Sequence, residues 1–171
     1  MSQTDKATML RVDQAGEFGA TRIYAGQLAV LGDRHPCSAE IRHMAAQEQD
    51  HLLRFNALLA ERGVRPTALQ PFWHVAGFAL GAATALIGPE AAMACTAAIE
   101  TEIDLHYTQQ LDALGDDDPD LRETIREFRD DERDHHDKAI AAGAERAPAY
   151  PLLSAAIRLG CRAAIRLSER F

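Results

Sequence analysis

The chain has few of the residues that β-sheet, disulfide-bonded and nucleic-acid-binding proteins depend on. Only 6% of its 171 residues are aromatic, and a β-sandwich or β-barrel needs more aromatic and β-branched side chains. The cysteines Cys37, Cys95 and Cys161 are odd in number and far apart, which favours reduced thiols over a disulfide framework. The net charge of −8 argues against nucleic acid as a partner, because phosphate binding needs a basic surface.

The first residues, Met-Ser-Gln-Thr-Asp-Lys, lack the apolar core of a secretory signal and the Arg/Ser-rich character of a transit peptide. We therefore expect the protein to be on the cytoplasmic side. Its length predicts a single domain, residues 1–171, with enough chain to bury a sizeable core.

Apolar residues make up 47% of the sequence, and alanine is common among them, which suits close helix packing. No segment of useful length has a strand pattern. We predict an all-α protein of six helices, separated by glycine and proline breaks. The expected helices are about Thr4–Leu31, Ser38–Gly63, a short apolar helix between Pro71 and Gly88, Pro89 to about Gly115, Pro119 to about Gly143, and a last helix after Pro151 to about Ser168.

One pattern of a single glutamate followed by Glu-x-x-His occurs twice. Glu17 precedes Glu48-x-x-His51 by 31 residues, and Glu100 precedes Glu132-x-x-His135 by 32 residues. A tyrosine, Tyr24 or Tyr107, follows each single glutamate after seven residues. The repeat predicts a two-helix unit used twice, with the apolar segment as the crossover between the pairs, as in a ferritin-like four-helix bundle.

Residues three apart on a helix share a face, so each Glu-x-x-His can direct a carboxylate and an imidazole at one point. Four glutamates and two histidines in this order are the ligand set of a carboxylate-bridged dinuclear site, and they suit iron or manganese. We assign Glu48 and Glu132 as bridges, with the remaining ligands divided between the metals as Glu17 with His51, and Glu100 with His135.

The alternative is that each Glu-x-x-His is an ordinary surface pair, which is the commoner meaning of a single such match. Two matches, each with a glutamate upstream, are much harder to obtain by chance. Four carboxylates directed into a core without metal would also repel one another and would be costly to desolvate. We therefore favour the metal site.

Several neighbouring polar residues have two possible roles. Gln47 and Asp131 precede the two bridging glutamates and are candidates for hydrogen bonds to a histidine across the site. Asp50 and Asp134 are either members of the same polar network or solvated acids.

For Tyr24 we favour a structural hydrogen bond to a carboxylate, and for Tyr107 both this role and a proton or electron relay stay open. Glu102 is about 200° round its helix from Glu100, so the two cannot serve one site.

Two segments suggest contact with lipid. No charged residue occurs between Pro71 and Pro89, which predicts a segment lying in one leaflet or covering an apolar channel; a buried core helix is the equal alternative. In the last helix an arginine recurs every four residues among apolar ones, which predicts a basic amphipathic lipid contact or else an ordinary surface helix. These arginines are Arg158, Arg162, Arg166 and Arg170.

Several strings in the chain go beyond this general pattern. They are Val12-Asp13-Gln14-Ala15-Gly16-Glu17, Arg22-Ile23-Tyr24-Ala25-Gly26-Gln27, Gly77-Phe78-Ala79-Leu80-Gly81-Ala82 and Leu167-Ser168-Glu169-Arg170. With them the chain, from about Leu10 to Phe171, resembles the demethoxyubiquinone hydroxylases, the di-iron monooxygenases of ubiquinone biosynthesis. All six ligand positions of that family are filled here. One departure is that an acid often follows the fourth-helix ligand directly, where this chain has Thr101 and then Glu102.

The resemblance implies hydroxylation of demethoxyubiquinol, 2-polyprenyl-3-methyl-6-methoxy-1,4-benzoquinol, with dioxygen at two iron ions. It also implies NADH as a possible reductant, although the chain has no G-x-G-x-x-G string. We expect a bacterial-type peripheral protein on the cytoplasmic face of the cell membrane. Its partners would be the lipid surface, the prenylated benzoquinol and dioxygen, with a homo-oligomer or a lipid-presenting protein as further possibilities.

Three other functions compete with this one. A ferritin-type ferroxidase or iron-handling protein would share the ligands but should have an evenly hydrophilic exterior. A rubrerythrin-like peroxidase would need a cysteine-rich electron-transfer module, which three scattered cysteines cannot supply. A metal-free helical scaffold at the membrane surface would tolerate Glu48→Ala and Glu132→Ala without loss of function.

Overall fold

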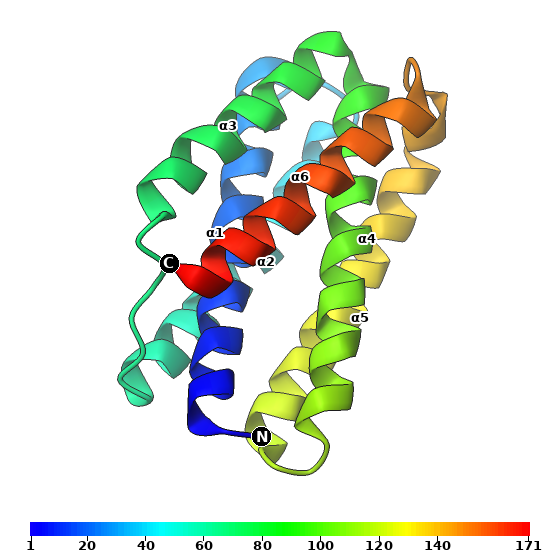
Figure 1. Ribbon diagram of the computed structural model, residues 1–171. Helices are drawn as coiled ribbons and strands as arrows, with labels where there is room; N and C mark the ends of the chain where they lie inside the picture. The colour runs from blue at the N-terminus through cyan, green and yellow to red at the C-terminus, as the bar shows by residue number, and fades with distance from the viewer.

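The computed structural model describes residues 1–171 and is entirely helical, as predicted (Figure 1). Four long helices form a ferritin-like bundle. An apolar helix connects the two pairs, and one more helix follows at the C-terminus. The elements are α1 (Gln3–Leu31), α2 (Ser38–Glu61), α3 (Gln70–Ile87), α4 (Pro89–Leu114), α5 (Pro119–Ala141), the 3₁₀ turn η1 (Ala144–Arg146) and α6 (Tyr150–Arg170).

Local sequence signals explain where these helices begin and end. Ser2 caps α1 in a capping box: its side chain accepts a hydrogen bond from the Asp5 amide, and the Asp5 carboxylate accepts one from the Ser2 amide. Gly32 ends α1 with a φ of 69°, a conformation that glycine adopts without steric cost. Asp118 caps α5, and Pro119 takes its first position. The predicted boundaries are therefore correct to within a few residues.

The bundle core consists of two apolar layers with a polar layer between them. On α2, Met44 belongs to one apolar cluster and Phe55 to the other, and Glu48 and His51 lie between these two residues in the sequence. The same alternation holds on α1, where Leu10 and Tyr24 belong to different clusters on either side of Glu17. The fold thus places the predicted ligands near the middle of the bundle.

Helix α3 packs closely against α1, and glycines make this approach possible. A Cβ atom built on Gly81 would lie 1.9 Å from the backbone oxygen of Ile23, and one on Gly26 would lie 2.2 Å from that of Phe78. These distances are far below van der Waals contact. The glycines of the crossover segment therefore serve helix–helix packing.

Helices α3 and α6 lie on the same side of the bundle, over α1 and α4 (Figure 1). Their outward faces are apolar: Val75 and Leu86 on α3 are 65% and 74% exposed, and Leu152 on α6 is 74% exposed. The alternative of a buried core helix for the charge-free segment is therefore wrong. None of the six helices combines the length and the apolar character needed to cross a bilayer.

Candidate metal centre

The structure brings the six residues of the repeated pattern together at the centre of the bundle, and each is at most 3% exposed. They form two overlapping groups in which one donor atom per residue lies within 4.8 Å of the others. Glu48 and Glu132 belong to both groups. The first group adds Glu17 and His51, and the second adds Glu100 and His135. This is the division expected from the sequence, and coordination by these residues stays a prediction.

Most of the donor atoms of this cluster have no hydrogen-bond partner that would account for their burial. Both carboxylate oxygens of Glu48 and of Glu132 are buried and unpartnered, as is one oxygen each of Glu17 and Glu100. Buried carboxylate oxygens are normally hydrogen-bonded or bound to a metal. The residues therefore fit a pair of divalent cations, whose positive charge would neutralise the four carboxylates.

The electrostatics of the cluster follow from burial and crowding. Burial and the neighbouring carboxylates raise the pKa of Glu48 and of Glu100 well above the ordinary value. Burial opposes a charge on His51, but the adjacent Glu132 and Glu17 outweigh it and raise the pKa of His51 to about 11. Without cations, protons compensate part of the negative charge.

Each histidine has one ring nitrogen toward the cluster and the other toward a polar partner. His51 Nδ1 lies 3.3 Å from Glu132 Oε1, and its Nε2 lies 3.1 Å from Asp131 Oδ2. His135 Nδ1 lies 3.1 Å from Glu48 Oε1, and its Nε2 lies 3.2 Å from Gln47 Oε1. The predicted contacts of Asp131 and Gln47 are thus confirmed, and they orient both imidazoles toward the carboxylates.

Each of the two tyrosines makes a hydrogen bond to the single glutamate of the other copy of the repeat. The Tyr24 hydroxyl donates to Glu100 Oε1 at 2.6 Å, and the Tyr107 hydroxyl donates to Glu17 Oε1. Both side chains are fully buried. The structural contact expected for Tyr24 is confirmed, and Tyr107 makes the same kind of contact. Asp50 and Asp134 are exposed on the surface, which agrees with their alternative as solvated acids.

Two buried acids have roles that the sequence analysis did not identify. Asp13 is 3% exposed, accepts a hydrogen bond from Gln110 at 2.6 Å and lies 3.3 Å from His106. Its position four residues before Glu17, on the same helix face, was an available signal. Glu102 faces away from the cluster, as expected, and pairs with Arg158 and Arg162 of α6. No local pattern predicts that pairing, which depends on how α6 crosses α4.

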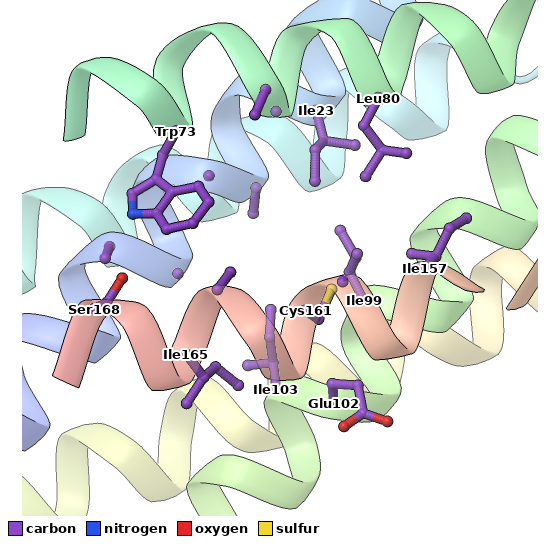
Figure 2. A pocket seen from close by; sticks show the side chains of 18 of the residues that line it. Ile23, Trp73, Leu80, Ile99, Glu102, Ile103, Ile157, Cys161, Ile165 and Ser168 are labelled. Carbon is purple, nitrogen blue, oxygen red and sulfur yellow. The ribbon is translucent and has the colours of Figure 1, made fainter. Parts of the chain in front are cut away.

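An apolar cavity of about 560 Å³ lies beside the cluster, between α1, α3, α4 and α6. Figure 2 shows Trp73 and Leu80 of α3 on one side and Ile157, Cys161 and Ile165 of α6 on the other. Of its 21 lining residues, 15 are hydrophobic, so it suits an apolar ligand.

Residues next to two of the predicted ligands in the sequence line the cavity. Its lining includes Gly16 on α1 and Ile99 on α4, the direct neighbours of Glu17 and Glu100. The same turns of these two helices therefore carry ligands on one face and cavity wall on another.

Comparison with known proteins agrees with these features. The family model described as ubiquinone biosynthesis protein COQ7 matches residues 4–168. The chain belongs to this family. It is 60% identical to the 3-demethoxyubiquinol 3-hydroxylase of Rhodospirillum rubrum over 94% of this chain and 76% of that protein. It is 53% identical to the human mitochondrial NADPH-dependent 3-demethoxyubiquinone 3-hydroxylase, over 95% and 76% of the two chains.

A more distant COQ7-family relative is the yeast mitochondrial 5-demethoxyubiquinone hydroxylase, 44% identical over 95% of this chain and 76% of that protein. The resemblance stated from the sequence is thereby confirmed. All of these relatives are named as hydroxylases of one class of quinone, and the matched region includes both halves of the repeat.

Proposed function

We propose that this COQ7-family chain hydroxylates demethoxyubiquinol, using dioxygen at a dinuclear iron site in the bundle centre. The observation that carries the proposal is the pair of overlapping donor groups, in which unpartnered, buried carboxylates face two imidazoles. The names of the relatives support the reaction and the class of substrate. A single domain formed by residues 1–171 is part of the same proposal.

In this proposal Glu48 and Glu132 would be shared by the two metal ions. Glu17 and His51 would complete one position, and Glu100 and His135 the other. Iron held by these residues would supply the redox chemistry for dioxygen activation. In the overall reaction one oxygen atom would enter the quinol ring and the second would leave as water, with two electrons from an external reductant. Asp131 and Gln47 keep the histidine rings in the binding orientation. The Tyr24 and Tyr107 hydroxyls hold Glu100 and Glu17 in place.

The cavity provides the site for the substrate. Its apolar lining suits an isoprenoid tail, and its contact with the turns that carry Glu17 and Glu100 suits a ring that must come close to the metals. Trp73 lies in this lining, and its indole N–H is buried without a hydrogen-bond partner. It is the group available to donate a hydrogen bond to an oxygen substituent of the ring.

The exposed apolar side chains of α3 and α6 are the surface by which the protein reaches its lipid-soluble substrate. We expect peripheral attachment to the cytoplasmic face of the cell membrane through this surface. Arg166 and Arg170 make no ion pair within the chain and can contact anionic lipid, whereas Arg158 and Arg162 are paired with Glu102. Two of the four arginines expected to contact lipid are therefore free to do so.

Electrons would come from a nicotinamide nucleotide. The resemblance implies NADH, whereas the names of the mammalian relatives specify NADPH. A purified reaction should therefore be supplied with each nucleotide in turn.

A complementation experiment tests the proposed function. Cells that lack their own demethoxyubiquinol hydroxylase would receive the wild-type chain, Glu48→Ala or the control Asp50→Ala, which changes an exposed acid. We expect ubiquinone from the wild type and the control, and accumulated demethoxy precursor from Glu48→Ala. Normal ubiquinone levels with Glu48→Ala would refute the proposed site.

A further inference from the structure

Helix α6 forms one wall of the apolar cavity but is itself held by little apolar burial. Only Ile157 and Ser168 of its 21 residues are buried, and Leu152 and Leu159 are 74% and 67% exposed. Figure 2 shows this helix on the side of the cavity opposite Trp73. Its apolar packing consists of Ile157 with the partly buried Tyr150, Leu153 and Cys161, so polar contacts can contribute substantially to its position.

The main polar contact is an ion cluster around Glu102. The Glu102 side chain is 5% exposed and accepts hydrogen bonds from Arg158 Nε at 2.6 Å and from Arg162 Nε and Nη2, both at 2.8 Å. A buried carboxylate bound by two guanidinium groups is a strong and directional contact. Removing the Glu102 charge would release Arg158 and Arg162, whose side chains are 34% and 50% exposed, from α4.

The cluster lies where it can set the width of the cavity. Arg158 and Arg162 are one helical turn apart, and Cys161 between them lines the cavity together with Ile157. Glu102 itself contributes to the lining. Each guanidinium is anchored on α4, the helix that carries Glu100, so the separation between α6 and α4 is fixed beside the predicted metal centre.

We propose that Glu102 is a positioning residue, which fixes α6 as the outer wall of the cavity and so determines how well the cavity holds the isoprenoid tail of the substrate. The inference rests on the proposed function for the identity of the ligand. The anchoring of α6 by Glu102 rests on the contacts alone. Glu102 acts on tail binding and leaves the metal ligands unchanged.

Kinetics with two substrates of different tail length test this role. Glu102→Gln keeps the shape of the side chain and removes its charge; Arg162→Gln removes one partner on the exposed side and serves if the first variant does not fold. Arg54→Gln, which removes an exposed arginine of α2 on another side of the bundle, is the control for the loss of one positive charge. For both Glu102→Gln and Arg162→Gln we expect KM to rise about tenfold for a long-tailed demethoxyubiquinol and to change little for a short-tailed analogue. The kcat and the iron content should stay unchanged.

Hydrogen exchange provides a readout that does not depend on turnover. Amides of α6 should exchange faster in Glu102→Gln and in Arg162→Gln than in the wild type, while those of α2 and α5 stay unchanged. Unchanged exchange in α6, an equal rise of KM for both substrates or a loss of iron in the variants would overturn the role of Glu102. If the wild type itself turns over neither substrate, the proposed function fails, and the exchange data still decide whether Glu102 anchors α6.

Discussion

The two halves of the bundle hold the same predicted ligands in different surroundings. Tyr24 contacts Glu100 across the bundle, and Tyr107, 83 residues later, contacts Glu17. The polar partners of the histidines follow the same symmetry but differ in charge: His51 faces the carboxylate of Asp131, whereas His135 faces the amide of Gln47. The two halves thus repeat the predicted ligands but differ in the groups around them.

A second pair of equivalent contacts, made by Gln110 and Gln27, also has an acid in the first half and a neutral side chain in the second. Gln110 donates to Asp13 at 2.6 Å, and the equivalent Gln27 donates to Thr96 at 3.3 Å. We call the group of Glu17 and His51 the first half-site, and that of Glu100 and His135 the second. The first half-site has the acids Asp13 and Asp131 nearby, where the second has the neutral side chains of Thr96 and Gln47. We expect the first half-site to bind a divalent cation more tightly, because the additional carboxylates lie near its ligands.

Removing a shared ligand should have the largest effect, since it breaks both half-sites together. Glu48→Ala and Glu132→Ala should each lose both metal ions and all hydroxylase activity. The metal-free variants should nevertheless be folded, and more stable than metal-free wild type by about 1–3 kcal/mol, because a repelling buried carboxylate is gone. Metal analysis and thermal unfolding check this, with Asp50→Ala as the control. Full metal content in either variant would contradict the bridging assignment.

Removing a ligand that belongs to one group should break one half-site only. Glu17→Ala and Glu100→Ala should each retain about one metal ion per chain, because the other group is left complete. Metal content after anaerobic loading with ferrous iron measures this. Loss of both ions from one variant and of neither from the other would contradict the expectation that each group binds one ion independently of the other.

The stability of the metal-free protein should depend on pH with a definite sign. The folded-state pKa values of Glu48, Glu100 and His51 lie above their unfolded values, so the folded state binds more protons. Their contribution is fully present below the unfolded carboxyl pKa of about 4.3 and is lost as the pH rises through each folded pKa, which for His51 is about 11. The opposite shifts of Glu17 and His135 reduce this slope.

Urea unfolding at about pH 5, 7 and 9 should therefore show falling stability without metal. With metal bound the trend should reverse, because metal displaces these protons and binds more tightly at higher pH. Stability that rises with pH in the metal-free protein would contradict the electrostatic account of the cluster.

The smallest expected effect concerns the difference between the halves directly. Asp131→Asn should weaken metal binding at the Glu17 half-site about tenfold, and Gln47→Glu should strengthen it at the other half-site. Calorimetric titration with Mn²⁺ distinguishes the two steps, and Asp50→Asn is the control for loss of a surface charge. Two equal binding steps in the wild type would show that the outer acids do not distinguish the positions.

The sequence predicted the parts of the structure that repeat or that local chemistry determines. Helix limits followed from glycine and proline breaks such as Gly32 and Pro119. The convergence of the predicted ligands followed from helix periodicity and the repeated spacing. The contacts of Asp131 and Gln47 were also predictable, because each lies one residue before a glutamate that we predict to bridge the metals.

Contacts that depend on how helices cross were not predictable from one sequence. Each tyrosine contacts the glutamate of the other half, and predicting this requires knowledge of which helices face each other across the bundle. The pairing of Glu102 with Arg158 requires the crossing of α6 over α4, and the cavity arises from the space that α3 and α6 leave between them.

Isotope incorporation tests the central claim most directly. The iron-loaded protein would be given demethoxyubiquinol, a nicotinamide reductant and heavy-isotope dioxygen, and the quinone product would be analysed by mass spectrometry. The account predicts one heavy oxygen atom in the ring of the product. Iron bound and dioxygen consumed without labelled product would contradict it and would favour ferroxidase chemistry.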